Sequence, residues 1–303
     1  MDKLANPTYK DLSIEEERKV ARTFMGRMEW EMILIGLGQV TAWVLTWILV
    51  VGNSIPLWAG FFISTITTSF AYLPSHAGQH GHLSGKLKNL KWLNSVVGQL
   101  SLIPLAQSHH VLKATHLKHH AHTNDPEKDP DYMHTHVNHW WQAAFNVHLQ
   151  TGIDGKLVKI VERFSKEDPL FKANMEKGGL FSLLFLFAQM IVVLFYPIET
   201  FLLWWIPRKL ATSYLGIIFS MEPHNKLPKG RYKDTRLWSN GFPRFLNHSM
   251  QIHAMHHMYP KINHFDEPKA IEALKPFMIK RKIPNSNILP SKIRLNSLIN
   301  LTN

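Results

Sequence analysis

The chain has 303 residues, and its 34 lysines and arginines against 22 aspartates and glutamates give a formal net charge of +12. An apolar fraction of 45%, with 17 phenylalanines and 10 tryptophans, excludes a disordered chain. The absence of cysteine excludes disulfide staples, thiolate zinc sites and cysteine-ligated iron–sulfur clusters within this sequence. The unusual count is that of 19 histidines, none of which precedes His76 or follows His264.

Residues 1–31 carry charges of both signs, and the first apolar run begins only at residue 32. This run starts too late and is too long for a secretory signal. We therefore predict that residues 1–31 form a cytoplasmic N-terminal segment.

Two uncharged runs, at 32–51 and 56–74, are separated by a four-residue link. A bilayer core needs about 20 mostly apolar residues per helix. The two runs therefore predict a first transmembrane hairpin over residues 32–74. The alternative is a pair of core helices in a soluble protein, in which two such runs rarely lie so close together.

A long polar segment, residues 75–178, follows the first hairpin and contains most of the histidines. Within it, residues 92–106 are apolar but too short and too polar to span a membrane. They predict an interfacial or half-buried helix.

The second hairpin is predicted over residues 179–221, an apolar run interrupted by Arg208 and Lys209. If the chain turns near Pro197, this charged pair snorkels or faces protein. If it turns near Pro207, the last helix is short. We prefer the first arrangement.

The positions of lysine and arginine indicate the orientation. Six precede residue 32, 12 lie within 75–177 and 14 follow residue 221, whereas the 52–55 link has none. The positive-inside rule then places both termini and residues 75–178 in the cytoplasm. The expected fold is one all-α integral membrane domain over 1–303, in the inner membrane. Its four transmembrane helices form two hairpins, and a cytoplasmic helical cap includes the C-terminal segment 222–303.

Eight histidines form three short clusters: HxxxH at 76–80, HxxHH at 116–120 and HxxHH at 253–257. Residues three or four apart lie on one face of an α-helix. Each cluster therefore directs two or three imidazoles toward one point, as a metal centre requires. Eight nitrogens exceed the four ligands of a tetrahedral zinc ion and suit two metal ions.

The sequence excludes two other kinds of metal site. No glutamate follows the first histidine of the 76–80 cluster, so the zinc-protease signature HExxH is absent. The Glu-x-x-His pairs of carboxylate-rich diiron bundles are also absent. Imidazole suits iron, copper and zinc about equally, so the ligand type alone does not select the metal.

The three clusters, in this order and beside two membrane hairpins, resemble the histidine boxes of the integral-membrane fatty acid desaturase/hydroxylase superfamily. The resemblance extends over about residues 32–260. The stretches ATHLKHHAHTNDPEKDPDY and EPHNKLPKGRYKDTR, with the later NHSMQIHAMHHMYP, are similar to a bacterial branch of desaturase-like enzymes and β-carotene hydroxylases. The first box, HAGQH, departs from many relatives because no acidic residue follows its first histidine.

The resemblance implies two non-haem iron ions bound almost wholly by histidine on the cytoplasmic side, with O2 as co-substrate. It also implies a ninth ligand between the second hairpin and the last box, for which His224 is preferred and His248 is the competitor. The expected metal ligands are His76, His80, His116, His119, His120, His224, His253, His256 and His257.

The other ten histidines are expected in packing, at the surface or beside ligands; they are His82, His109, His110, His122, His134, His136, His139, His148, His248 and His264. Carboxylates near the boxes could accept the second N–H of a ligating imidazole. The candidates are Asp125, Asp129, Asp131, Glu222 and Asp234.

The expected function is an O2-dependent fatty-acyl desaturase that acts on a long lipid chain. One alternative is a hydroxylase of a carotenoid or other lipid with the same chemistry, and a distant one is a non-catalytic membrane metal-binding or transport protein. No built-in redox group is visible, so electrons are expected from an external ferredoxin-like or cytochrome-like donor. No motif for nucleic acid is present.

Overall fold

The computed structural model describes residues 11–149, 155–239, 242 and 244–288, and every named element among them is a helix. Their one β-bridge joins Met25 to Ile262. The predicted all-α class is therefore confirmed.

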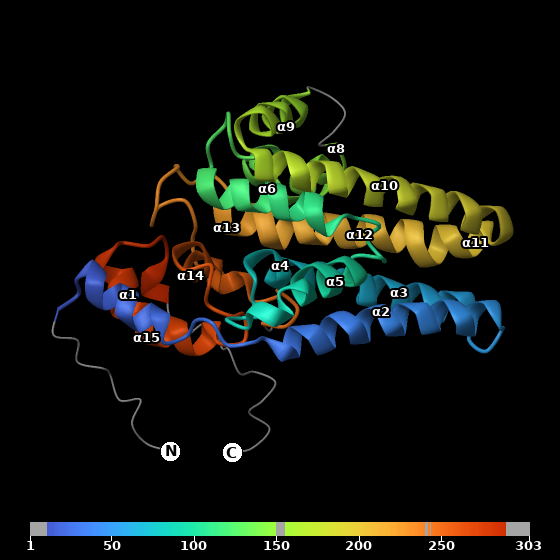
Figure 1. The fold of residues 1–303 in the computed structure, drawn as a ribbon, viewed down its shortest axis with the longest axis horizontal. Coiled ribbons are helices and arrows are strands. Elements are labelled where there is room, and N and C mark those ends of the chain that lie inside the picture. The colour runs from blue at the N-terminus through green and yellow to red at the C-terminus, as the bar shows by residue number, and fades with distance from the viewer. Residues whose placement is uncertain (1–10, 150–154, 240–241, 243, 289–303) are drawn as a thin grey trace, which may run out of the picture.

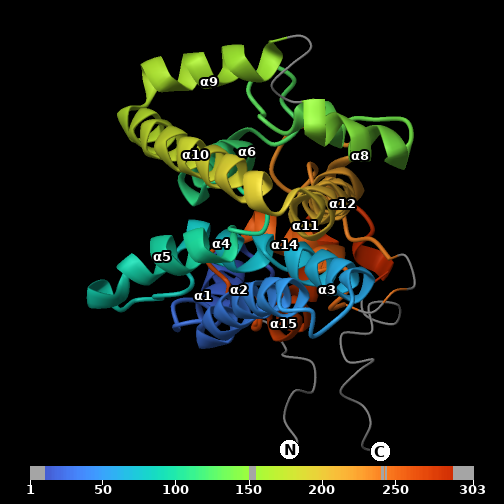
Figure 2. The ribbon, with the colours of Figure 1, turned by 90° about the vertical axis from the view of Figure 1, so that its right-hand side faces the viewer.

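The long helices lie in two layers (Figure 1). The lower layer contains α2 (Trp30–Val51) and α3 (Leu57–Ser69), and the upper layer contains α10 (Pro169–Phe195) and α12 (Ile206–Leu215). The end-on view in Figure 2 shows α10 and α12 above α2 and α3. Most of the shorter helices lie away from the end that holds the α2–α3 link, with α11 (Pro197–Glu199) as an exception, and they form a helical cap on the long helices.

The predicted span over 56–74 is divided between two helices. Helix α3 ends at Ser69, and after Phe70 and Ala71 the chain continues as α4 (Tyr72–His80). Helix α3 has 13 residues, so it is shorter than the run from which the span was predicted. The bend matters for function because α4 carries the first histidine box.

The second hairpin turns at Tyr196, as in the preferred arrangement, but its first helix begins at Pro169, ten residues before the predicted start. Asp168 begins this helix, because its carboxylate accepts hydrogen bonds from two backbone N–H groups of the first turn. Arg208 faces protein: its Nη1 lies 3.4 Å from Gln189 Oε1 on α10.

The returning half of this hairpin is one long helix with two π turns. It comprises α11 (Pro197–Glu199), a π turn at Thr200–Trp205, α12, a second π turn at Gly216–Met221 and α13 (Glu222–His224). A π turn displaces backbone carbonyls from their usual partners. The carbonyl of Leu203 accepts a hydrogen bond of 3.2 Å from the Trp43 indole of α2, which ties the two layers together.

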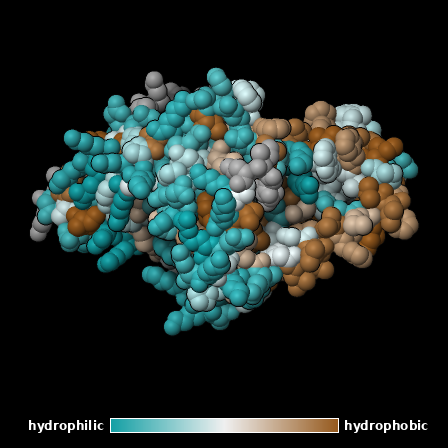
Figure 3. All heavy atoms as spheres, turned by 90° about the horizontal axis from the view of Figure 1, so that it is seen from above, coloured by the Kyte–Doolittle hydropathy of each residue, from teal (hydrophilic) through white to brown (hydrophobic). Residues whose placement is uncertain are grey.

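Two helices, α2 and α10, are long and apolar enough to cross a membrane by length and composition. Large apolar side chains of α10 point outward, including Leu183, Phe187 and Leu194. Figure 3 shows that hydrophobic residues gather at one end of the molecule and hydrophilic residues at the other. The four-span topology and the cytoplasmic orientation remain predictions.

The remaining elements form the cap. They are α1 (Ile14–Arg22), α5 (Trp92–Ser101), α6 (His109–His122), α7 (Tyr132–Thr135), α8 (Trp140–Leu149), α9 (Lys156–Glu167), α14 (His253–Met258), α15 (Glu267–Lys280) and 3-10 turns at Lys88–Leu90, Met250–Ile252 and Ser286–Ile288.

Helix α5 is half-buried: Trp92, Val96 and Leu100 are exposed along one face, whereas Val97 is buried. One apolar core joins α1, α14 and α15, and another joins α2, α4, α5 and α12. The histidine boxes lie between these cores.

Candidate metal centre

The three predicted boxes lie on three helices, α4, α6 and α14. The structure brings the imidazoles of all three together, although the first and third boxes are 176 positions apart at His80 and His256. Two groups of potential metal ligands result. The first contains His76, His80, His116, His120 and His256, and the second contains His119, His224 and His257.

Four Nε2 atoms of the first group form a closed ring. The distances are 2.9 Å between His80 and His116, 3.0 Å between His116 and His120, 3.2 Å between His120 and His256, and 3.1 Å between His256 and His80. The fifth member, His76, lies beside this ring, with its centroid 4.6 Å from that of His116.

Hydrogen bonding alone does not account for this ring. The Nε2 of a neutral imidazole either donates one N–H or accepts, and one N–H cannot point along two contacts at once. At most two of the four contacts can be well-aligned hydrogen bonds. Around a metal with bonds of about 2.1 Å to nitrogen, ligand atoms at right angles lie about 3.0 Å apart. The ring therefore fits a metal ion better than it fits a hydrogen-bonded cluster.

The ligand atoms of the second group all lie within 4.8 Å of one another. The His224 ring centroid is 4.8 Å from that of His119 and 4.6 Å from that of His257. The remaining predicted residue, His253 of the third box, lies between the groups, because its Nε2 is 3.1 Å from His257 Nε2 and its ring is 5.1 Å from that of His256.

Of the two candidates for the ninth position, His224 lies in one of the two histidine groups and His248 lies in neither. His224 is fully buried, and its Nδ1 donates to the Asp234 backbone carbonyl at 3.0 Å, so its Nε2 is left without a hydrogen-bond partner among the described residues. His248 instead stacks on Phe70 at 4.9 Å and meets the edge of Phe219. A buried nitrogen that faces other imidazoles without a hydrogen bond has the surroundings expected of a metal ligand.

Of the five candidate carboxylates, Asp129 makes the close contact with a box histidine. Its Oδ1 lies 2.8 Å from His119 Nδ1, and its Oδ2 accepts from the Asn124 backbone N–H. Burial lowers the pKa of His119, but the neighbouring Asp129 carboxylate outweighs this effect and raises the pKa to about 9. Because Asp129 occupies Nδ1, the Nε2 of His119 is directed into the second group.

The other four candidate carboxylates have weaker or different contacts. Asp131 lies 3.9 Å from His119 Nδ1 and 3.8 Å from His134 Nε2. Asp234 accepts from the Thr235 hydroxyl, and only its backbone carbonyl meets His224. Asp125 accepts from a turn N–H and from Lys229, and Glu222 is half-buried near Arg236.

Apart from His119, the surroundings of the box histidines favour the neutral form of the imidazole. Burial and then the neighbouring imidazoles hold the pKa values of His76, His80, His116, His120, His253, His256 and His257 well below their usual range. Burial also lowers the pKa of His224 to about 3. Neutral imidazoles keep the lone pair that a metal needs.

Several of the remaining histidines pack against or hydrogen-bond to neighbouring side chains. His109 is fully buried and lies 2.9 Å from the Ser75 hydroxyl, against Gly78 and Gly98. His122 stacks on Phe164, and His148 lies 2.9 Å from the Ser213 hydroxyl.

Sequence reasoning missed two buried glutamates, Glu29 and Glu267. Glu29 lies 3.4 Å from His82 Nδ1, and Glu267 lies 3.6 Å from His256 Nδ1 and 3.4 Å from His264 Nδ1. The spacing of three residues between His264 and Glu267 is the one local signal that could have suggested a contact.

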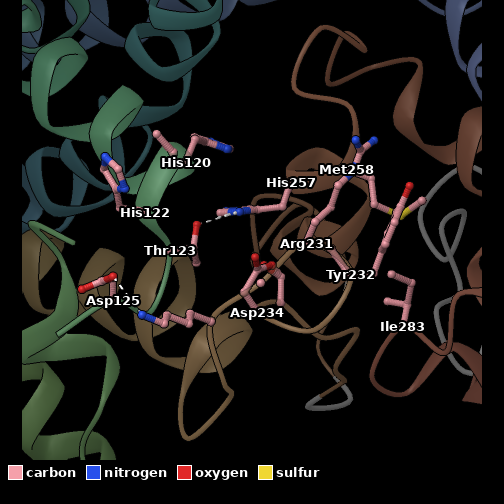
Figure 4. A pocket seen from close by; sticks show the side chains of 15 residues that line it. His120, His122, Thr123, Asp125, Arg231, Tyr232, Asp234, His257, Met258 and Ile283 are labelled. Carbon is pink, nitrogen blue, oxygen red and sulfur yellow. Dashed lines mark hydrogen bonds and ion pairs between the residues drawn. The ribbon is translucent and has the colours of Figure 1, made fainter. Parts of the chain in front are cut away.

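Two cavities reach the histidines from different sides. A cavity of about 310 Å³ lies between α6, α12 and the second π turn and reaches His116, His119 and His253; Leu112, Leu215 and Phe219 contribute apolar walls. A second cavity of about 500 Å³ reaches His120 and His257. Figure 4 shows His257 in this second cavity, directed toward Thr123, with Arg231 and Tyr232 on the opposite side from Asp125.

The family model described as "Fatty acid desaturase" matches residues 53–285. The chain is 24% identical over 278 residues to the chloroplastic omega-3 fatty acid desaturase of Glycine max, a match that covers 80% of this chain and 58% of the relative. It is 25% identical over 303 residues to the temperature-sensitive sn-2 acyl-lipid omega-3 desaturase (ferredoxin) of Arabidopsis thaliana, covering 88% of this chain and 66% of that one. The matches therefore span less than two thirds of these two relatives.

Two further similarities come from other branches. The sn-1 oleoyl-lipid 12-desaturase of a Picosynechococcus strain is 23% identical over 278 residues, covering 81% of this chain and 76% of the relative. The zeaxanthin 4-ketolase of Chlamydomonas reinhardtii is 33% identical over 113 residues, covering 35% of this chain and 25% of the relative.

Proposed function

Because the chain belongs to the fatty acid desaturase family and is an oxidoreductase, we propose that it is an O2-dependent, non-haem diiron desaturase of long-chain lipids. The observation that carries the proposal is the arrangement of nine imidazoles, eight of them in two contiguous groups and His253 between these groups. Each group would hold one iron ion.

The donor atoms fit this assignment. Both His76 Nε2 and His224 Nε2 are buried without a hydrogen-bond partner among the described residues, one in each group. When bound, the iron pair would supply the activation of O2 and the removal of hydrogen from an unactivated C–H bond, which side-chain acids and bases cannot perform.

The chain itself would position the lipid and exclude water. The cavity that reaches His116, His119 and His253 opens between helices α6 and α12. Its walls of Leu112, Leu215 and Phe219 suit an acyl chain, and its lining histidines would hold one stretch of that chain near the metal site. Orientation at this point decides which carbon reacts, because misplacement by about 1 Å can cost a hundredfold in rate.

We also propose that the four long helical segments cross the inner membrane as two hairpins, with both termini and the histidines in the cytoplasm. The apolar exterior of α2 and α10 supports membrane insertion, and the lysine and arginine distribution supports the orientation.

Electrons would come from an external ferredoxin-like carrier. Two relatives carry ferredoxin in their names. In this chain, Lys226, Lys229, Arg231 and Lys233 are exposed on one loop, which borders the cavity that reaches His120 and His257. A basic loop this close to the proposed irons favours an acidic partner.

Lipid analysis of a host that expresses the chain tests the proposal. The expected result is new double bonds in acyl chains with the unaltered protein and none with the variant His119→Ala, His120→Ala. His139→Ala is the matched control, because His139 is exposed and outside both groups.

Unchanged product in the double variant would refute the metal mechanism. New hydroxyl or keto groups in place of double bonds would identify a lipid hydroxylase. Iron analysis of the purified protein should find about two irons per chain.

A further inference from the structure

In each of the two proposed metal groups, one histidine lies beside a buried carboxylate. Asp129 faces the Nδ1 of His119 in the second group at 2.8 Å. Glu267 faces the Nδ1 of His256 in the first group at 3.6 Å, a longer contact than that of Asp129. Each group thus has one histidine whose outer nitrogen points to a buried carboxylate.

The two nitrogens of His256 face different surroundings. Its Nε2 belongs to the closed ring, at 3.1 Å from His80 and 3.2 Å from His120. Its Nδ1 therefore points away from the ring, toward the side chain of Glu267, which is 4% exposed. An imidazole that binds metal through Nε2 must carry its proton on Nδ1, and that N–H needs an acceptor in a buried site.

Glu267 is held in place from its other side. Its second oxygen lies 3.4 Å from His264 Nδ1, and His264 Nε2 lies 3.0 Å from the Ser249 hydroxyl. Arg244 donates to Ser249 through Nε and to the His264 carbonyl through Nη2. This arrangement uses two residues near the third box, His264 and Ser249, that the proposed metal site leaves without a role.

The charge balance supports the same role. Neutral imidazoles bring no charge, so two divalent ions would leave an uncompensated positive charge in a buried site. Glu267 faces His256 with one carboxylate oxygen and His264 with the other, so its charge would offset that of a cation bound by His256.

We propose that Glu267 is a positioning residue that fixes the tautomer and orientation of His256, and that it stabilises the metal ion of the first group as Asp129 does for the second. The inference rests on the proposed diiron function. Glu267, which lies outside the three boxes, would thus help the protein to retain its metal ions.

Iron retention by purified full-length protein tests the role of Glu267. We expect Glu267→Ala to lose one of about two irons per chain during a chelator challenge, with an affinity for that iron lower by about tenfold to a hundredfold. Glu267→Gln keeps an acceptor without the charge, so it should retain iron better than Glu267→Ala and less well than the unaltered chain. Glu272→Gln, at an exposed position of the same helix, should retain both irons.

The iron spectrum gives a second readout. Mössbauer spectra of the unaltered protein should resolve two iron environments, of which Glu267→Ala alters one and Asp129→Asn alters the other. Unaltered chelator resistance and spectra in both Glu267 variants would overturn the inference. If Glu267→Ala does not fold, as judged by circular dichroism, the Glu267→Gln comparison decides. An unaltered chain that binds no iron would refute the proposed function itself.

Discussion

At the scale of single residues, the metal-free histidines differ in the sign of their response to pH. Histidines whose pKa is lowered, such as His80 and His116, bind fewer protons when folded than when unfolded. Their contribution to stability is complete above the unfolded value of 6.5 and decreases as the pH falls below it. His119 has a raised pKa, so its contribution is complete below 6.5 and is lost as the pH rises through about 9.

Since seven box histidines have strongly lowered pKa values and only His119 has a raised one, acid should destabilise the metal-free protein. We expect the Tm of chelator-treated protein in detergent to fall between pH 7 and pH 5. Each such histidine adds up to about 1.4 kcal/mol per pH unit to the slope of the unfolding free energy. His80→Gln removes one of these groups and should give a shallower slope. A Tm that is constant or rises toward pH 5 would contradict the assignment of neutral imidazoles.

The clustering of the box histidines was largely predictable at this scale, because helical spacing directs HxxxH and HxxHH clusters toward one point. His224 was harder, since a lone histidine carries no periodicity and only the resemblance indicated it. Glu29 and Glu267 were not predicted. Glu29 meets His82 and Glu267 meets His256 across separate segments of the chain, so only the tertiary arrangement reveals these two contacts.

At the scale of elements, α4 holds the first box by packing closely on α5. A Cβ added to Gly78 would lie 2.5 Å from the Asn94 backbone carbonyl of α5. Asn94 also binds the Leu83 backbone and the Ser84 hydroxyl, so it cannot move away freely.

Gly78→Ala should therefore displace α4 and destabilise the protein by about 1–3 kcal/mol, the usual cost of overpacking. The measurements are the Tm in detergent and the iron content, both of which should decrease. Gly38→Ala is the matched control, because no atom lies within 4 Å of a Cβ added to this helical glycine. Equal Tm values for the two variants would show that the α4–α5 contact is not tight.

The helix boundaries were only partly predictable. The hydropathy of 56–74 is continuous, but the chain bends at Phe70 and Ala71, where α3 ends and α4 turns toward the other boxes. Helix α10 extends back to Pro169 because Asp168 caps it, although residues 169–178 are too polar to be read as part of a span. The π turn at Gly216–Met221 lies directly before α13, and each extra residue rotates the downstream helix by about 100°. A prediction from uniform helical periodicity would therefore misplace His224.

At the scale of the whole molecule, hydrophilic residues gather at one end and hydrophobic residues at the other (Figure 3), and two cavities with different lining residues reach the histidines. The cavity beside α6 and α12 accepts the lipid in our proposal, whereas the loop with Lys229 and Arg231 borders the other cavity. Lipid and electron donor could thus occupy the protein together.

Reversing two charges on this loop tests where the donor binds. We expect Lys229→Glu, Arg231→Glu to lower kcat/KM for a reduced ferredoxin by about tenfold at low salt, because steering depends on complementary charge. Added salt should slow the unaltered enzyme and slow the variant less.

The control variant is Lys159→Glu, which reverses an exposed charge on α9. It should leave both the rate and the salt dependence near those of the unaltered enzyme. A salt-independent rate in the unaltered enzyme would contradict docking on the basic loop.

The wide sequence separation within the first histidine group also has a consequence for biosynthesis. His256 emerges from the ribosome 136 residues after its ring neighbour His120, a delay of about 10 s at common translation rates. Until then the early histidines offer only part of a coordination shell, and no nascent fragment can hold metal as the finished chain would. In our proposal, iron would therefore bind only after the third histidine box has been synthesised. Cells short of iron should accumulate full-length protein in which no metal ion joins the three boxes.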